Sequence, residues 1–372
     1  MGSISVSRNA PCWESSNSIL EKGKFMPHIG IIGGAGFIGS NAADAYLRKG
    51  HTVTVFDNLS RKGTDKNIEW LIREHADKVT FIKGDIRKQS AELDSLIEKA
   101  EIILHLAGQV AVTTSVINPR DDFENNALGT FNVLESVRKC DTKKILIYSS
   151  TNKVYGKLNE INIVEGKKEY SFKDNPFGIP ETTPLDFYSP YGCSKGAADQ
   201  YVHDYARIYG MRTIVFRQSC IYGNRQFGVE DQGWIAWFAI ASKLDRPITI
   251  YGNGKQVRDI LYVDDLVEAF EKAVENIDST AGKIYNIGGG PGKAISLLKS
   301  IEQLEDIIKK KIKLEYRAWR PGDQPIYISD VRLAENDFGW KPKTEITEGL
   351  MKLISWVDNN IYDIKKATED IV

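Results

Sequence analysis

Three residues of this sequence could together move a proton while a hydride leaves a carbon atom. Tyr191 and Lys195 stand four residues apart in a segment that predicts a helix, and Thr151 follows a predicted strand at 144–148. Residues at positions i and i+4 share one face of a helix. A phenol has an ordinary pKa of about 10 and is a poor base, but a neighbouring ammonium favours its phenolate. The three side chains therefore predict a redox active site in which Tyr191 transfers the proton.

A glycine-rich turn near the start of the chain could hold a dinucleotide. Gly33, Gly36 and Gly39 lie between an apolar segment at 28–33 and a predicted helix. This spacing permits a tight turn, a close approach of the backbone to a pyrophosphate, and close packing of the helix on the strand. Asp57 ends the next predicted strand, where a carboxylate would accept the ribose hydroxyls. The motif therefore predicts a dinucleotide site.

Asp57 also favours NAD over NADP, because a carboxylate repels a further phosphate on the ribose. Arg61 and Lys62 keep the alternative open, since a nearby base could receive a 2′-phosphate, although both could also belong to a solvated loop. Asp85 and Ile86 follow the third predicted strand. They could meet the adenine, or Asp85 could form a surface turn that caps the next helix.

These side chains need a scaffold that brings the ends of several strands together. Short apolar segments alternate with helical patterns, and strands are predicted at 28–33, 52–56, 79–82, 102–106, 144–148 and 213–216. This alternation predicts an α/β fold with a Rossmann-type doubly wound parallel sheet, followed by a smaller mixed α/β C-terminal substrate lobe. We expect a mobile tail at 1–27, an NAD-binding domain at 28–216 joined by 258–287, and a substrate-binding lobe at 217–257 and 288–372.

Composition and charge exclude several classes of protein. The 372 residues are 42% hydrophobic and carry a formal net charge of −1, so no overall field favours nucleic acid or an anionic membrane. No apolar run approaches the roughly 20 residues that span a bilayer, and residues 1–27 lack the apolar stretch of a secretory signal. Four widely spaced cysteines indicate reduced thiols in a cytoplasmic protein, and no cluster with histidine predicts a metal.

Taken together, the motifs resemble the extended short-chain dehydrogenase/reductase family, and within it the nucleotide-sugar epimerases of the CDP-paratose 2-epimerase (CDP-tyvelose epimerase) type. The resemblance covers nearly everything after residue 27 and is carried by segments 56–63, 105–111, 149–156, 189–201 and 252–259. It implies NAD as the cofactor and Thr151, Tyr191 and Lys195 as the catalytic residues. The expected cofactor contacts are Tyr191 and Lys195 with Gly33, Gly36, Phe37, Ile38, Gly39, Asp57, Asn58, Ser60, Arg61, Asp85, Ile86, Leu106, Ala107 and Gln109.

The two residues after Thr151 separate two reactions of the family. Related 4,6-dehydratases eliminate water and usually carry an Asp-Glu pair there, whereas this chain has Asn152 and Lys153. Without these carboxyl groups, oxidation followed by reduction is favoured over elimination. The expected activity is that of an isomerase, an NAD-dependent epimerisation at C2 of a nucleotide-activated sugar through a transient 2-keto sugar. A 4-epimerase, a GDP-hexose 2-epimerase and a catalytically silent NAD-sensing or scaffold protein are the alternatives.

A nucleotide-diphosphate sugar, with a CDP-sugar favoured, requires positive charge in the second lobe. The resemblance implies that Arg225, Arg258 and Arg320 supply it, although each arginine could instead form a surface ion pair. The other expected substrate contacts are Thr151, Asn152, Lys153, Gln226, Gln256 and Asp323. No nucleic acid or membrane partner is expected, and the family commonly pairs two helices beside the active site, so we expect a homodimer or homotetramer.

Three further side-chain expectations concern packing rather than chemistry. Trp234, Trp237 and Phe238 are spaced as one face of a helix, which favours core packing over sugar stacking. Cys193 is expected to be a small packed residue rather than a nucleophile. Lys153 is as compatible with solvent as with a substrate.

Overall fold

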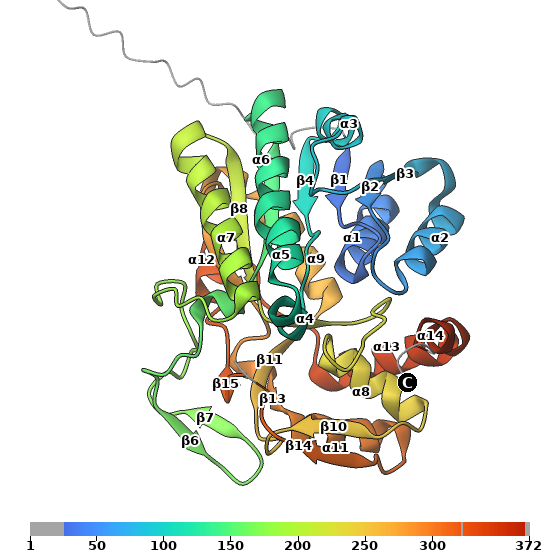
Figure 1. Cartoon of the computed structure of the whole chain (residues 1–372), viewed down its shortest axis with the longest axis vertical. Helices are drawn as coiled ribbons and strands as arrows, with labels where there is room; N and C mark the ends of the chain where they lie inside the picture. Colours follow the sequence, from blue (N-terminus) through green and yellow to red (C-terminus); the bar gives the residue numbers. More distant parts are fainter. Residues whose placement is uncertain (1–25, 321–322, 369–372) are drawn as a thin grey trace, which may run out of the picture.

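The largest feature of the computed structural model, which describes residues 26–320 and 323–368, is a seven-stranded parallel sheet (Figure 1). In spatial order its strands are β12 (Ile284–Ile287), β8 (Arg212–Gln218), β5 (Ile145–Thr151), β4 (Ile102–His105), β1 (Ile29–Ile32), β2 (Val53–Asp57) and β3 (Val79–Lys83). The order reverses between β1 and β4, and ligands of such sheets bind beyond the carboxyl ends of the strands at that point. The predicted fold is confirmed.

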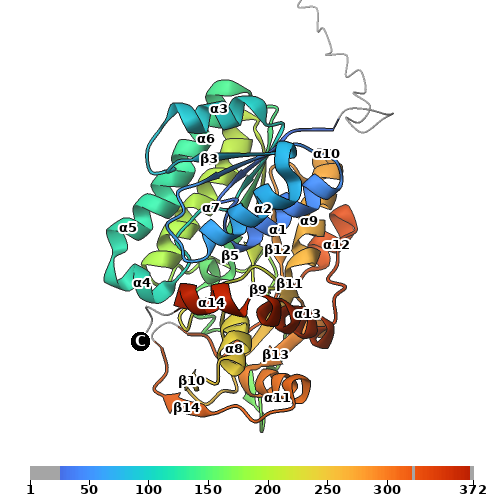
Figure 2. The ribbon, with the colours of Figure 1, turned by 90° about the vertical axis from the view of Figure 1, so that its right-hand side faces the viewer.

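Helices cover both faces of this sheet, as Figure 2 shows. One layer contains α1 (Phe37–Arg48), α2 (Thr64–His75), α9 (Val263–Glu275) and α12 (Arg332–Phe338), and the other contains α3 (Ala91–Lys99), α6 (Gly129–Cys140) and α7 (Pro190–Tyr209). Each layer packs its own apolar cluster on the sheet: Ile31 faces the first and Ile32 the second. Because both faces are buried, the strands read as continuous apolar runs.

The second lobe lies below the sheet in Figure 1 and is built around a small mixed sheet. Strand β11 (Val257–Tyr262) pairs with β9 (Cys220–Tyr222), β13 (Ala294–Ser296) and β15 (Ile326–Tyr327), while β10 (Ile248–Tyr251) pairs with β14 (Leu314–Arg317). The lobe's helices are α8 (Trp234–Lys243), α11 (Leu297–Ile308), α13 (Ile346–Asn359) and α14 (Ile361–Thr368). Strand β11 belongs to the small sheet and does not extend the large sheet. This differs from the expectation that the residues from 258 onward join the NAD-binding domain. Strand β12, in contrast, does extend the large sheet.

Short elements connect these parts. They are α4 (Val112–Ile117), α5 (Pro119–Phe123), α10 (Ile277–Thr280), the β6 (Ile163–Glu165) and β7 (Tyr170–Phe172) hairpin, the 3-10 turns Ala76–Lys78, Asn152–Tyr155 and Pro291–Lys293, and the π-helical turn Glu124–Leu128. Trp237 and Phe238 are buried in the second lobe, which confirms the expected core packing, and Trp234 is partly buried beside them. The expected mobile tail lies outside the described residues except for 26 and 27. Across the described ranges, no helix is long and apolar enough to cross a membrane.

Candidate active site

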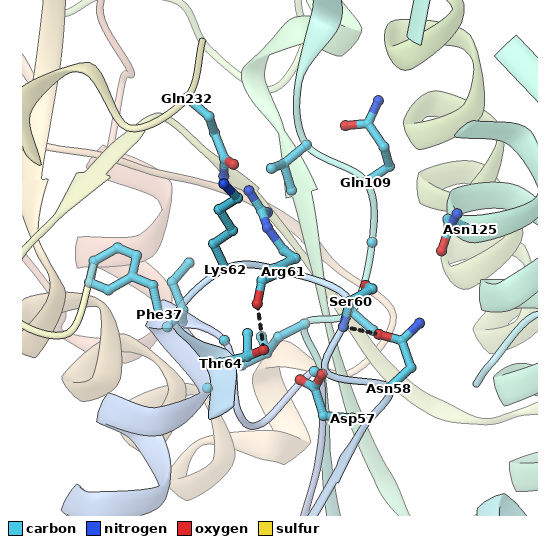
Figure 3. Close-up of a pocket in the computed structure, with 18 of the residues that line it drawn as sticks. Phe37, Asp57, Asn58, Ser60, Arg61, Lys62, Thr64, Gln109, Asn125 and Gln232 are labelled. Atoms are coloured by element: carbon cyan, nitrogen blue, oxygen red, sulfur yellow. Dashed lines mark hydrogen bonds between the residues drawn. The ribbon is translucent and has the colours of Figure 1, made fainter. Parts of the chain in front are cut away.

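A cavity of about 490 Å³ opens beyond the carboxyl ends of β1, β2 and β4 (Figure 3). It is lined by the glycine turn, by the loop after β2, by the loop after β4, and by a segment of the second lobe at 225–232. The expected cofactor contacts that line it are Gly33, Gly36, Phe37, Ile38, Gly39, Asp57, Asn58, Ser60, Arg61, Ile86, Leu106, Ala107 and Gln109. Segments far apart in the chain thus form one cavity at the position where the sheet order reverses.

The three glycines of the turn are required for different physical reasons. Gly33 has a φ of +83°, and a Cβ on Gly39 would lie 2.3 Å from the Gly33 carbonyl oxygen, so both positions are closed to a side chain. A Cβ on Gly36 would meet only that same oxygen, at 3.2 Å, and otherwise faces open space. This leaves a cradle at the amino end of α1, where free amides attract phosphate. The residues present therefore fit the pyrophosphate of NAD.

Asp57 places its carboxylate at the edge of the cavity. Its Oδ2 accepts a hydrogen bond from the Ala35 amide at 3.1 Å, and its Oδ1 accepts one from the Leu59 amide at 2.8 Å. Burial raises the pKa of Asp57, while these backbone bonds and the charge of Arg61 oppose the rise. The carboxylate is thus fixed by the backbone where ribose hydroxyls could donate to it.

The side chains of Arg61 and Lys62 extend into the cavity toward Gln232, as Figure 3 shows. Burial lowers the pKa of Arg61, and the acidic groups of Tyr191 and Asp57 oppose that fall. Both side chains line the cavity and are exposed, so the arrangement is compatible with a cofactor contact and with a solvated loop.

Asp85 does not line the cavity, and its expected adenine contact is not supported. Arg87 Nη2 donates to Asp85 Oδ2 at 2.6 Å, and the Arg87 amide donates to Oδ1 at 2.9 Å. Hydrogen bonds from Arg87 lower the pKa of Asp85. The residue forms the surface turn considered above, although it is Ser90 that caps the next helix, α3.

The structure brings Thr151, Tyr191 and Lys195 together. Thr151 ends β5, and the first turns of α7, which carry the other two residues, pack against that strand. All three side chains are buried, and Lys195 Nζ donates to the Ser149 carbonyl oxygen at 2.5 Å and lies 4.3 Å from the centroid of the Tyr148 ring. Helix α7 begins there because Pro190 suits the first turn and Ser189 Oγ accepts the Gly192 amide.

Burial opposes ionisation of both Tyr191 and Lys195. It raises the pKa of Tyr191 to about 12, against a hydrogen bond with Thr151 and the charge of Arg61. It lowers the pKa of Lys195 to about 7, against the charges of Asp199 and Asp122. The phenolate and ammonium pair therefore depends on neighbouring charges that offset part of this desolvation.

A second group of expected residues meets where the lobes adjoin. Lys153 Nζ lies 3.4 Å from Gln324 Oε1, and Arg258 Nη2 donates to Asp323 Oδ1 at 2.6 Å. Burial lowers the pKa of Lys153, and the positive charge of Arg258 lowers it further. Lys153 is only partly buried, which fits a substrate contact and partial exposure to solvent alike. Asn152, 7% exposed, lies beside Thr151, whose Oγ1 is 3.4 Å from Asn152 Oδ1.

Arg225 is bound within the cofactor-binding half rather than free for a diphosphate. Its Nη2 donates to Asn41 Oδ1 at 2.8 Å and lies 3.3 Å from Asp44 Oδ2, and its guanidinium lies 4.1 Å from the Trp70 ring centroid. Asn67 Nδ2 also donates to the Arg225 carbonyl oxygen at 3.2 Å. This differs from the expected substrate contact, because the side chain ties the segment above the cavity to α1 and α2.

The remaining expected residues belong to the second lobe. Arg320 forms an ion pair with Asp231 at 2.8 Å, and its guanidinium lies 3.9 Å from the Tyr251 ring centroid. Gln256 Nε2 donates a hydrogen bond to the Tyr251 carbonyl oxygen. Gln226 lines the cavity. Cys193 is exposed, so the expectation that it is packed is wrong.

A buried ion pair behind the catalytic strand was missed by the sequence reasoning. Arg217 Nη2 donates to Asp199 Oδ1 at 2.9 Å, and Ser150 Oγ donates to Asp199 Oδ2 at 2.6 Å. The pair joins β8 to α7 next to Thr151. The sequence signal that could have indicated this pair is Arg217, which directly follows the apolar residues of β8.

The parallel sheet, the glycine turn and the Tyr-x-x-x-Lys helix beside a hydroxyl on β5 are the features of the extended short-chain dehydrogenase/reductases. The chain belongs to the family described as GDP-mannose 4,6 dehydratase, whose model matches residues 31–353. It is 44% identical to a CDP-paratose 2-epimerase of Salmonella typhi over 88% of this chain and 98% of that protein.

Two further comparisons come from 4-epimerases. A putative UDP-glucose 4-epimerase of Methanocaldococcus jannaschii is 33% identical over 89% of this chain and 98% of that protein. The crystal structure of a UDP-glucuronic acid 4-epimerase from Bacillus cereus, in complex with UDP-glucuronic acid and NAD, superposes with a TM-score of 0.77 at 26% identity over 89% of this chain and 99% of that one. The predicted family, the isomerase class and the NAD cofactor are confirmed.

Proposed function

We propose that this protein inverts C2 of a CDP-activated sugar, interconverting CDP-paratose and CDP-tyvelose through a 2-keto sugar. The observation that carries the proposal is the pair Asn152 and Lys153, which follows Thr151 in the buried turn where elimination would need two carboxyl groups. The 44% identity to a CDP-paratose 2-epimerase supports it.

The proposed mechanism assigns one task to each catalytic side chain. Bound NAD supplies a reversible acceptor for the hydride of the sugar carbon. Tyr191 Oη takes the proton of the C2 hydroxyl and later returns it to the same oxygen atom. Thr151 holds that oxygen by a hydrogen bond, and the Lys195 ammonium favours the phenolate. Because the 2-keto sugar is reduced on its opposite face, the net reaction is an isomerisation.

We propose that the substrate occupies the junction of the two lobes. Lys153, Arg258 and Arg320 supply positive charge for the diphosphate there, and Asn152, Gln226, Gln256 and Asp323 are the proposed polar neighbours. In this assignment residues 28–216 bind NAD, and residues 217–257 and 288–372, together with Arg258 of β11, bind the nucleotide sugar. Anchoring the diphosphate leaves the sugar ring free to turn its other face to the cofactor.

Epimerisation at C4 is the second candidate. The same three catalytic residues could act on a C4 hydroxyl if the sugar were seated differently, and two relatives of this chain bear 4-epimerase names. The position of the sugar, rather than the catalytic group, separates the two reactions.

The test is to incubate the purified protein with CDP-paratose and with CDP-tyvelose in deuterated water and to follow the sugars by NMR. We expect interconversion with essentially no deuterium at C2, because the hydride returns from the cofactor rather than from solvent. Tyr191→Phe should retain NAD binding and lose roughly 10²–10⁴-fold in turnover, since the general acid-base group is removed.

Two results would contradict the proposal. Extensive deuteration at C2 would indicate a carbanion route, and inversion confined to C4 would transfer the activity to the 4-epimerase alternative. Unchanged turnover of the Tyr191→Phe variant would exclude Tyr191 from the mechanism.

A further inference from the structure

Asp122 is a buried carboxylate beside the catalytic helix that the proposed mechanism does not use. It lies in α5 and is 1% exposed. Ser194 Oγ donates to Asp122 Oδ2 at 2.5 Å, and Ser194 directly precedes Lys195. Asn126, in the π-helical turn, donates to Asp122 Oδ1 at 3.2 Å, and Gln109 Nε2 donates to the same oxygen at 3.0 Å. The carboxylate is therefore held from three separate elements of the chain.

The hydrogen-bond donors of Asp122 are neutral, which sets it apart from the other acid near Lys195. Asp199 receives two hydrogen bonds from the guanidinium of Arg217, so its charge is matched at close range. Asp122 takes its hydrogen bonds from a hydroxyl and two amides. Both carboxylates act on Lys195, with the larger effect from Asp199, and Asp122 is the one that no cation binds directly.

We propose that Asp122 is a positioning residue whose negative charge keeps the buried ammonium of Lys195 protonated and thereby sets the pH range in which Tyr191 and Lys195 work together. This inference rests on the proposed function only where turnover of CDP-paratose is measured. Ser194, Asn126 and Gln109 hold the carboxylate so that it acts on the amino-terminal turns of α7.

The direction of the expected effect follows from the sign of the charge. The negative charge of Asp122 raises the pKa of Lys195 and also that of Tyr191. Asp122→Asn removes the charge while keeping nearly the same shape, so both pKa values should fall. Activity requires the Tyr191 phenolate together with the Lys195 ammonium, so each limb of the pH profile follows the pKa of one of these two groups. Both limbs of the pH profile should therefore move to lower pH.

The other charged groups around the site are unchanged by this substitution. His105, packed from β4, is buried, and burial lowers its pKa to about 3, so it stays neutral. Arg61 acts on Tyr191 from the cavity. Asp121, next to Asp122, is bound by Arg87 at 3.0 Å, and Asp199 stays paired with Arg217. A shift in the profile would therefore report the charge of Asp122 itself.

The experiment titrates the NAD-loaded, full-length protein in two ways. One is the pH profile of CDP-paratose turnover, and the other is phenolate formation by ultraviolet difference absorbance, with the Tyr191→Phe protein subtracted. For Asp122→Asn we expect both limbs and the phenolate midpoint to move about one unit to lower pH. Asp122→Glu, which keeps the charge, should stay near the wild-type values. Asp204→Asn on the exposed part of α7 is the matched control and should change neither.

Coincident phenolate midpoints for wild type and Asp122→Asn would overturn the inference, as would an equal shift in Asp122→Glu. If Asp122→Asn does not fold, Asp122→Ser, which also removes the charge, is measured instead. It should shift the midpoint in the same direction, and no shift would overturn the inference. The phenolate titration needs no substrate, so a protein that shows the shift without CDP-paratose turnover would refute only the proposed function.

Discussion

The ammonium group of Lys195 lies in a setting that favours the neutral amine. Its side chain is 5% exposed, and burial lowers its pKa to about 7. In the unfolded chain a lysine has its ordinary pKa of about 10.4. Between these two values the unfolded chain binds a proton that the native protein does not, so this residue disfavours folding most at low pH and its cost decreases as the pH rises through that interval. Chemistry at the site therefore comes at the expense of stability.

Lys195→Met should make the protein more stable at pH 6 while abolishing turnover. The apolar side chain has no charge to desolvate, and the gain in unfolding free energy should be on the order of a few kcal/mol. The difference from wild type should diminish as the pH rises from about 7 toward 10. Urea unfolding at several pH values measures this difference. A variant that is less stable than wild type at pH 6 would contradict the argument.

At the scale of elements, the turn between β1 and α1 contains one glycine that the fold requires and another that cofactor binding requires. A Cβ on Gly39 would collide with backbone atoms of the turn, 2.3 Å from the nearest. A Cβ on Gly36 would meet a single atom at 3.2 Å, and the φ and ψ of Gly36 are −68° and 175°, which any residue can adopt. The glycine at position 36 is therefore needed by the ligand rather than by the fold.

Gly36→Ala and Gly39→Ala should consequently fail in different ways. We expect Gly36→Ala to keep a melting temperature close to that of the wild type but to lose at least about tenfold in NAD affinity, because the methyl group occupies the pyrophosphate cradle. Gly39→Ala should unfold at a lower temperature, since the backbone must move. Thermal unfolding with and without NAD, together with NAD titration, measures both. Equal melting temperatures for the two variants would contradict this division.

The strands and the glycine turn could be predicted from the sequence because their signals are local. Apolar runs and glycine spacing identify each strand and the turn that follows it, and the ranges agree with the structure within a few residues. The Asp122 and Ser194 pair could not be predicted, because its members are distant in sequence and each also suits a solvated surface. Arg225 was assigned to a ligand for the same reason: an arginine in a loop does not reveal that Asn41 and Asp44 bind it.

At the scale of the whole molecule, the helices beside the active site expose apolar side chains. Tyr201 and Ile208 on α7 are 49% and 66% exposed, and the Tyr201 ring lies 6.0 Å from that of Phe131 on α6. Figure 1 shows the two helices next to each other on one face of the large sheet. Large apolar side chains gathered on one face commonly mark a contact with another protein. We propose that this face forms a homodimer or homotetramer.

The double variant Tyr201→Glu and Ile208→Glu should be a folded monomer, because two buried charges would oppose association. Light scattering coupled to gel filtration should give the wild type two or four times the chain mass of 41.8 kDa and the variant a single chain mass. Tyr362→Glu, at a more exposed aromatic position in the second lobe, serves as the control and should leave the assembly intact. A monomeric wild type would contradict the proposal.

The tie between the second lobe and the first two helices bears on how the coenzyme is used. Asn41 and Asn67 hold the backbone at residues 224 and 225, and the segment that follows lines the cofactor cavity. We infer that these bonds slow the exchange of NAD bound beneath the segment with the medium. The molecule would then behave as an enzyme with a permanent prosthetic group rather than a consumable co-substrate. Its rate would follow the supply of nucleotide sugar and be insensitive to the cell's ratio of oxidised to reduced nicotinamide.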